Sequence, residues 1–242
     1  MFKVKFGASR AISRLIHNYS HTNAAISLKL RGLTVRFRPL SYDPIALYFI
    51  LFKRIYGVVP SGYSVVDIGA HIGTFSLYAC LTNASQVLAF EPERNNFRLL
   101  THNIDTNRLA NRVKAFNLAV WSEDTKRTLF TSRGTAFHSF YPYAYHVGGI
   151  EPVTCKGINT ILQPLKGPIF LKVDAEGSEY EIITHIDDAN IRKIARIELE
   201  YHVGSEILKS LFPSLVRFLN SKAFRLTFRK DSNVISATKS AL

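Results

Sequence analysis

One acidic residue and two glycines stand close together at the end of an apolar run. Asp67, Gly69 and Gly73 have the spacing D-x-G-x-x-x-G, and the run over 65–68 is rich in β-branched residues. Such a run predicts a buried parallel strand, and a strand, a glycine turn and a helix let the backbone approach a nucleotide-like ligand. The spacing differs from the dinucleotide motif G-x-G-x-x-G. An acid before the first glycine favours a ligand with a cationic amino-acid tail over a pyrophosphate.

A second acid follows at the end of the next predicted strand. Residues 86–90 have the pattern of that strand, and Glu91 and Pro92 end it, 24 residues after Asp67. A carboxylate at the tip of the second strand, roughly 20 residues on, is where a ribose diol is bound in nucleotide-binding α/β folds. The alternative is that Asp67 and Glu91 are solvated acids at strand ends, although the glycines between them favour a binding site.

Further acids and a histidine follow two later apolar runs. Asp174 and Glu176 come after one run, and Glu200 and His202 after another. Asp174, Glu176 and His202 are candidate bases for taking a hydroxyl proton, and a free imidazole pKa of about 6.5 suits that task. Alternatively, His202 is a packed side chain that orients Glu200. A third option is a divalent cation bound by Asp174 and by Glu200 or His202, which would lower the pKa of a bound hydroxyl.

The elements that would position these residues alternate between strands and helices. A hairpin is expected over 27–37 and a helix over 43–56, with Asp43 as its N-cap and Pro44 at its first position. The later patterns predict helices over 94–105, 158–162 and 205–220, strands over 113–120, 128–131, 153–155, 169–173, 194–201, 224–228 and 233–236, and a loop over 132–150. This order predicts an α/β fold with a doubly wound, mostly parallel sheet of about seven core strands. Ligands then bind beyond the carboxyl ends of the strands.

The composition fits one domain with a short extension. The chain has 242 residues and 47% hydrophobic content, so residues 62–242 can form the sheet domain and residues 1–61 an N-terminal α/β extension of hairpin and helix. The net charge of +13 favours a phosphorylated substrate, nucleic acid or a membrane surface as a partner, or it reflects diffuse solvated cations.

Several features predict a cytoplasmic protein. The longest apolar run, 45–52, is too short to span a bilayer, and the first 20 residues lack the features of a signal peptide. Cys80 and Cys155 belong to no metal-ligand spacing, and free thiols fit a reducing compartment. The basic residues of the N-terminal segment leave peripheral contact with a membrane as a further expectation.

The segments around these residues resemble the FkbM-type methyltransferases. The resemblance covers 33–202 and rests on Val-Val-Asp-Ile-Gly-Ala-His-Ile-Gly (65–73), Phe-Glu-Pro (90–92), Asn-Leu-Ala-Val (117–120), Leu-Lys-Val-Asp-Ala-Glu-Gly-Ser-Glu (171–179) and Glu-Tyr-His (200–202). The block Lys-Val-Asp-x-Glu-Gly-x-Glu is specific to this family, whereas the glycine motif is shared more widely. The chain departs from the family at His71, where asparagine is commoner, and at Asn159, where aspartate is usual.

This resemblance implies a Rossmann-like fold, S-adenosylmethionine as the cofactor, and methyl transfer to a hydroxyl of a sugar, a lipid-linked compound or a secondary metabolite. The residues that it implies for cofactor binding are Asp67, Gly69, Ala70, His71, Gly73, Thr74, Glu91, Pro92, Asn117 and Ala119. Asp174, His202 and Glu176 stay the catalytic candidates, and Asp174 and Glu200 the metal candidates.

Two alternatives to this function remain. One is an RNA-modifying methyltransferase, although basic residues are spread along the chain and no RNA-binding module is recognisable. The other is a non-catalytic nucleotide-binding module.

Overall fold

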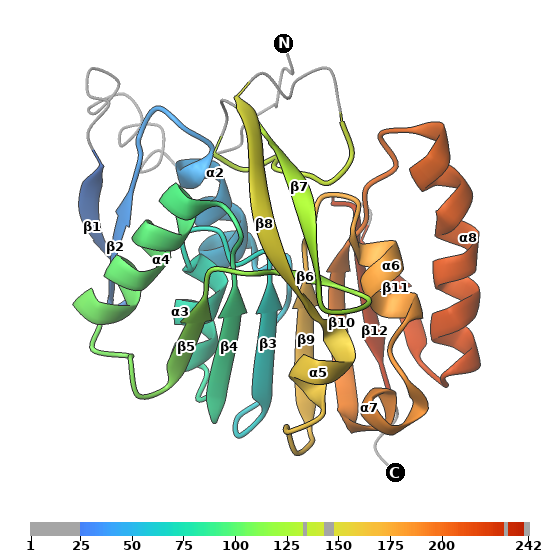
Figure 1. Ribbon diagram of the computed structural model, residues 1–242. Coiled ribbons are helices and arrows are strands. Elements are labelled where there is room, and N and C mark those ends of the chain that lie inside the picture. The colour runs from blue at the N-terminus through green and yellow to red at the C-terminus, as the bar shows by residue number, and fades with distance from the viewer. Residues whose placement is uncertain (1–24, 133–134, 143–147, 230–231, 240–242) are drawn as a thin grey trace.

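The structure of the protein is a computed structural model that describes residues 25–132, 135–142, 148–229 and 232–239 (Figure 1). Its centre is a seven-stranded sheet with the order β11-β12-β10-β9-β3-β4-β5. The strands of this sheet are β3 (Ser64–Ile68), β4 (Gln86–Phe90), β5 (Val113–Phe116), β9 (Ile169–Val173), β10 (Ile194–Glu200), β11 (Arg225–Phe228) and β12 (Val234–Thr238). Neighbours among β3, β4, β5, β9 and β10 pair in parallel, and β12 is antiparallel to both of its neighbours. The predicted mostly parallel sheet is confirmed.

Helices cover both faces of the sheet because its inner strands are apolar at consecutive positions. Val65 and Phe170 pack into the hydrophobic cluster on one face, whereas Val66 and Leu171 pack into the cluster on the other. The first cluster includes α3 (Thr74–Leu81) and α4 (Arg94–Thr106), and the second includes α5 (Ile158–Leu162), α6 (Glu179–Thr184), α7 (Asp188–Lys193) and α8 (Glu206–Ser221). Strands covered on both faces are typical of a doubly wound α/β fold, as predicted.

The N-terminal part of the described chain packs on the same face as α3. It consists of the hairpin β1 (Ile26–Leu30) and β2 (Leu33–Phe37), the helix α2 (Asp43–Tyr48) and the π-helix η1 (Phe49–Lys53). The hairpin is confirmed, and the helix predicted over 43–56 is present, but it changes from α-helix to π-helix at Phe49 and ends at Lys53. The prediction of Asp43 as N-cap is wrong. Tyr42 occupies that position, and the carboxylate of Asp43 accepts hydrogen bonds from Arg38 instead of from the first helical turn.

The strand predicted over 113–120 is two strands in different sheets. After β5, the side chain of Asn117 donates to the backbone oxygens of Glu91 and Pro92, and the chain leaves the central sheet. It then forms β6 (Ala119–Trp121), which pairs in parallel with β8 (Gly149–Gly157), while β7 (Thr125–Thr131) pairs with β8 in the antiparallel direction. In Figure 1, β7 and β8 extend above the upper edge of the central sheet. The short strands predicted over 128–131 and 153–155 are therefore parts of one longer ribbon.

The remaining predicted helices and strands are confirmed with small shifts of their ends, whereas the loop predicted over 132–150 lies partly outside the described residues. The helices expected over 94–105, 158–162 and 205–220 are α4, α5 and α8, and the last two strands are β11 and β12. In the described part of the chain, no helix is long and apolar enough to cross a membrane. Cys80 and Cys155 are both buried free thiols.

Candidate active site

A cavity of about 810 Å³ lies at the carboxyl ends of the parallel strands. Its lining comes from the turns after β3 and β4, from the ends of β9 and β10, from α2 and η1, and from the connection between β7 and β8. The sequence-predicted residues that line it are Gly69, Ala70, His71, Thr74, Glu91, Pro92, Ala119, Asp174, Glu176, Glu200 and His202. Asp67, Gly73 and Asn117 lie outside this lining.

The glycine turn after β3 is held tightly against two neighbouring strands. The backbone N–H groups of Gly69 and Ala70 both donate to the backbone oxygen of Phe90 at the end of β4, at 3.0 and 2.9 Å. Gly69 has a φ of +72°, and a Cβ there would lie 1.8 Å from the backbone oxygen of Asp174. Any side chain at this position would therefore push apart the turn and the end of β9.

Glu91 is a buried carboxylate that organises the turn. One of its oxygens accepts the backbone N–H of His71 at 2.8 Å, and the other accepts that of Glu93 at 2.9 Å. Burial raises the pKa of Glu91, and the neighbouring His71 and these two N–H groups work against that rise. The carboxylate also lines the cavity, so its unused lone pairs can accept further hydrogen bonds from a ligand.

Asp67 stabilises the floor of the site through a buried lysine. Its carboxylate accepts the hydroxyl of Ser76 at 2.6 Å and lies 3.2 Å from Nζ of Lys172. Lys172 also donates to the backbone oxygens of Ile68 and Gly69. Burial would lower the pKa of Lys172, but Asp67 and Asp174 raise it above its usual value, so the ammonium stays charged. Asp67 thus reaches the cavity only through Lys172.

A polar cluster around Asp43 joins the N-terminal segment to the glycine turn. The fully buried carboxylate of Asp43 accepts the side chain of Arg38 at 2.9 Å and the hydroxyl of Thr135 at 2.8 Å. It also lies 3.1 Å from Nε2 of His71. Arg38 donates in turn to the side chain of Asn96, which reaches the backbone oxygen of Thr135. Burial raises the pKa of Asp43, but His71 and Arg38 outweigh burial and hold it well below its usual range.

The two residues at which the chain departs from the family pattern, His71 and Asn159, lie in different places. His71 lines the cavity and contacts Asp43, whereas Asn159 lies outside the lining. The side chain of Asn159 bonds the backbone oxygen of His185 and the backbone N–H of Asp187, and it takes no part in the cavity lining. The two departures from the family pattern thus differ in consequence. The first touches the candidate cofactor site, and the second stabilises the connection around α7.

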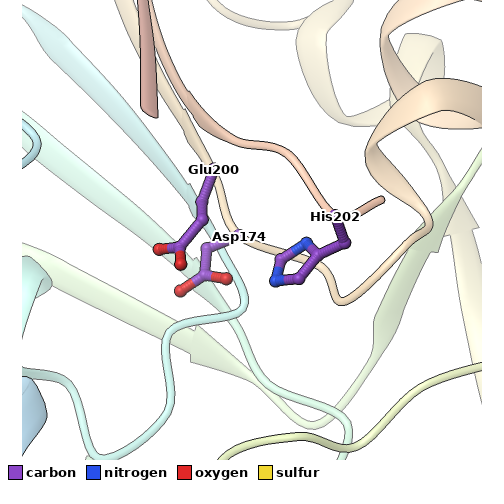
Figure 2. A group of neighbouring side chains, drawn as sticks. All are labelled: Asp174, Glu200 and His202. Atoms are coloured by element: carbon purple, nitrogen blue, oxygen red, sulfur yellow. The ribbon is translucent and has the colours of Figure 1, made fainter. Parts of the chain in front are cut away.

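Two acids and a tyrosine meet at the ends of β9 and β10. The hydroxyl of Tyr56 lies 2.9 Å from an oxygen of Asp174 and 2.6 Å from an oxygen of Glu200, and Figure 2 shows the two carboxylates side by side. Burial, and after it the negative charge of Asp174, raises the pKa of Glu200 to about 7. Burial and these two acids also raise the pKa of Tyr56, so its hydroxyl stays protonated. The Tyr56 hydroxyl has one proton and can donate it to only one of the two carboxylates at a time. The Tyr56 oxygen and the two carboxylate oxygens that it contacts therefore share protons.

His202 stands opposite this pair as a cation held between two glutamates. Its Nδ1 lies 3.2 Å from Glu179 and its Nε2 3.4 Å from Glu176. Burial would lower the pKa of His202, but Glu179 and Glu176 raise it well above 6.5. The pKa of Glu176 is itself raised to about 8, chiefly by burial. The imidazole expected to titrate near 6.5 is thus an imidazolium at neutral pH, which cannot accept a proton.

The predicted metal candidates do come together, but their ligand atoms already have partners. Single ligand atoms of Asp174, Glu200 and His202 lie within 4.8 Å of one another (Figure 2). The Tyr56 hydroxyl contacts both carboxylates, and a protonated His202 offers no lone pair. The nearby ammonium of Lys172, 3.8 Å from Asp174, already offsets part of their charge.

Several site residues were missed by sequence reasoning. Tyr56 stood only as the expected end of a helix, and nothing in its sequence neighbours pairs it with Asp174 or Glu200, which are 118 and 144 residues away. Lys172 belongs to the family-specific block, and that membership was the available signal. The further cavity residues Tyr42, Ala46, Phe49, Ile50, Ile55 and Phe137 form an apolar lining from α2, η1 and the β7–β8 connection.

The sheet order and the site at the strand ends define a Rossmann-like methyltransferase fold. The model of the methyltransferase FkbM domain matches residues 67–226, and the chain belongs to this family. A crystal structure of methyltransferase FkbM from Methylobacillus flagellatus KT has the same fold, with a TM-score of 0.52 at 18% identity over 78% of this chain and 47% of that one.

Two curated relatives match at similar identity. The 31-O-demethyl-FK506 methyltransferase FkbM of Streptomyces tacrolimicus is 29% identical over an alignment of 173 residues, and the match covers 58% of this chain and 66% of the relative. The AMB antimetabolite synthetase AmbE of Pseudomonas aeruginosa is 26% identical over an alignment of 215 residues, and the match covers 72% of this chain but 10% of that protein. The matched family region begins at Asp67, so Asp43, Tyr42 and Tyr56 all lie outside it.

Proposed function

We propose that the protein is an S-adenosylmethionine-dependent methyltransferase that acts on a hydroxyl oxygen. The observation that carries the proposal is one cavity containing both the Glu91 glycine-turn site and the Asp174–Glu200 carboxylate pair. The first resembles a site for a nucleoside with an amino-acid tail, and the second can receive a hydroxyl proton. Membership of the FkbM family supports the same reaction class.

The cavity residues fit this cofactor. Glu91 offers a carboxylate to a ribose diol, at the strand tip where such diols are bound. Oγ1 of Thr74 is buried, lines the cavity and has no hydrogen-bond partner among the described residues, so a polar ligand atom would satisfy it. When bound, S-adenosylmethionine supplies a methyl carbon that its sulfonium makes electrophilic, and the electrons of the broken bond return to sulfur.

The chain's own residues would orient the acceptor and accept its proton. Asp174 has 28% of its side chain exposed and lines the cavity, so an acceptor can reach it. As the new oxygen–carbon bond forms, the acceptor's hydroxyl proton passes to Asp174 or to the neighbouring Glu200. Tyr56 and Lys172 hold these carboxylates in place, and the His202 imidazolium balances the charge of Glu179. In this proposal His202 is a fixed cation and Asp174 the base.

The rest of the cavity favours an acceptor with an apolar body. Phe49, Ile50 and Ile55 line it from the N-terminal segment, and the rings of Tyr42 and Phe137, which also line it, meet edge to face with centroids 4.8 Å apart. Apolar and aromatic side chains with a few polar groups are the usual lining of sites for compounds of this kind. We therefore favour a lipid-linked or secondary-metabolite alcohol over a free sugar.

The test has a binding step and a transfer step. Calorimetry should show binding of S-adenosylmethionine and of S-adenosylhomocysteine; binding of NAD instead would overturn the assignment. Methyl-labelled S-adenosylmethionine is then incubated with lipid extracts, glycolipids and apolar alcohols, and with total RNA as a separate arm. Label in an alkali-stable lipid or alcohol product supports an ether-forming O-methyltransferase. Label found in RNA alone would contradict the proposed alcohol acceptor and identify the protein as an RNA methyltransferase.

A further inference from the structure

The net positive charge of this protein is concentrated near its N-terminus, because few of its acidic residues lie there. The first 66 residues contain ten of the 31 Lys and Arg residues but only one of the 18 Asp and Glu residues, so they carry +9 of the net +13. That single acid is Asp43, which is fully buried and paired with Arg38. The basic residues are spread along the chain, as expected, but only the N-terminal quarter lacks acids to balance them.

Four side chains of this segment contact one another in series, and a fifth follows them in the sequence to complete a surface patch. The guanidinium of Arg31, in the hairpin turn, lies 5.0 Å from the ring centroid of Phe52. Phe52 stacks on Tyr48 with centroids 6.2 Å apart, and Nζ of Lys53 lies 5.9 Å from the Tyr48 ring. Arg31, Phe52 and Lys53 are exposed, as is the following Arg54. We call Arg31, Tyr48, Phe52, Lys53 and Arg54 the Arg31–Phe52 patch.

This patch lies on the outer side of an element that lines the cavity. In η1, Phe49 and Ile50 line the cavity, whereas Phe52 and Lys53 are exposed to solvent. Phe52 keeps 37% of its surface exposed although it is a large apolar residue. One short helix therefore presents an aromatic and cationic surface outward and an apolar surface inward.

We propose that the Arg31–Phe52 patch is a docking surface for an anionic lipid bilayer. Aromatic rings flanked by lysine and arginine match the interface of a bilayer, where rings enter the headgroup region and cations meet lipid phosphates. Arg31 lies over the Phe52 ring and Tyr48 stacks on it, so both compete with a nucleobase for the faces of this ring, which favours lipid over nucleic acid. An acceptor with an apolar body could then pass along η1 into the cavity, a consequence that rests on the proposed function, whereas the docking itself does not.

Co-sedimentation of the full chain with vesicles tests the proposal. The probes are phosphatidylcholine vesicles with and without phosphatidylglycerol, each at low and high NaCl. Binding is expected only to the anionic vesicles, and it should weaken at high salt because phosphate contacts are screened. Each cation near an anionic surface contributes about a fivefold gain in partitioning, so the double variant Arg31→Glu with Lys53→Glu should lose more than about twentyfold.

Two controls separate this patch from net charge and from misfolding. The double variant Lys114→Glu with Lys126→Glu reverses two exposed charges on β5 and β7, outside the patch, and should lose much less binding. Phe52→Ser keeps every charge and should still lose several-fold, because no ring remains to enter the headgroup region. Both charge-reversal double variants should unfold at wild-type temperature, since Arg31, Lys53, Lys114 and Lys126 are exposed.

Three results would overturn the proposal. The first is no sedimentation of the wild type at low salt, and the second is an equal loss in the patch and control variants. The third is binding of a single-stranded RNA homopolymer that is lost in the patch variant while vesicle binding is unchanged. That last result would assign the surface to nucleic acid.

Discussion

Replacing Glu91 by glutamine should damage this protein in two separable ways. Both carboxylate oxygens of Glu91 already accept a backbone N–H, from His71 and from Glu93. Glutamine has one oxygen and one amide nitrogen, so in either orientation its NH₂ group faces one of these donors. A buried donor left without an acceptor costs about 1–3 kcal/mol, and Glu91→Gln should lower the free energy of unfolding by that amount.

The same variant should bind S-adenosylmethionine more weakly. If the carboxylate accepts the ribose hydroxyls, the loss of one charge-assisted hydrogen bond removes about 1.5–3 kcal/mol. Since each 1.4 kcal/mol is a tenfold change in affinity, the dissociation constant should rise about tenfold to a hundredfold. Titration calorimetry measures this directly, with urea unfolding of the same preparations.

Glu93→Gln is the matched control for this experiment. Glu93 is also buried and also accepts two backbone N–H groups, those of Asn95 and Asn96, but it lies outside the cavity lining. Its glutamine variant should lose similar stability and keep its affinity for S-adenosylmethionine. Unchanged affinity in Glu91→Gln would show that Glu91 only supports the turn. Equal loss of affinity in both variants would show that the effect travels through the fold.

Four further predictions concern the carboxylate group. Asp174→Asn should keep cofactor affinity within a few-fold and cut turnover by about a hundredfold or more, the usual contribution of a positioned base; wild-type turnover would remove Asp174 from that role. Tyr56→Phe should lower turnover more than cofactor affinity because Asp174 loses its hydroxyl partner, whereas Tyr78→Phe, which contacts the same Phe75 ring, should not. The pKa of Glu176 is raised to about 8, so the folded chain holds a proton that the unfolded chain releases near 4.5, and urea unfolding should show stability falling between those pH values. The raised pKa of His202 acts in the same direction above 6.5, and Glu176→Gln should flatten the profile. Transfer should survive a chelator, since both ring nitrogens of His202 face glutamates; loss of activity that magnesium restores would show that a cation displaces the Tyr56 hydroxyl.

The sequence determined the central sheet and the half of the site built on it. The apolar run 169–173 predicted the buried strand β9 to the residue, because a strand covered on both faces needs apolar side chains on both of them. Once those strands are parallel, residues directly after them must share one edge, so the meeting of Glu91, Asp174 and Glu200 at one cavity followed from their positions.

Only the tertiary structure decided which distant side chains contact these site residues and how those contacts set their protonation. No local pattern links Tyr56 to Asp174 or Asp43 to His71, because such pairs depend on how the N-terminal segment packs against the sheet. The charge of His202 could likewise not be predicted from the sequence. Its neighbours Glu176 and Glu179 lie more than 20 residues away and reach it only because the turn after β9 faces the end of β10. Chain position fixed which groups stand at the strand ends, and packing decided which of them holds a proton.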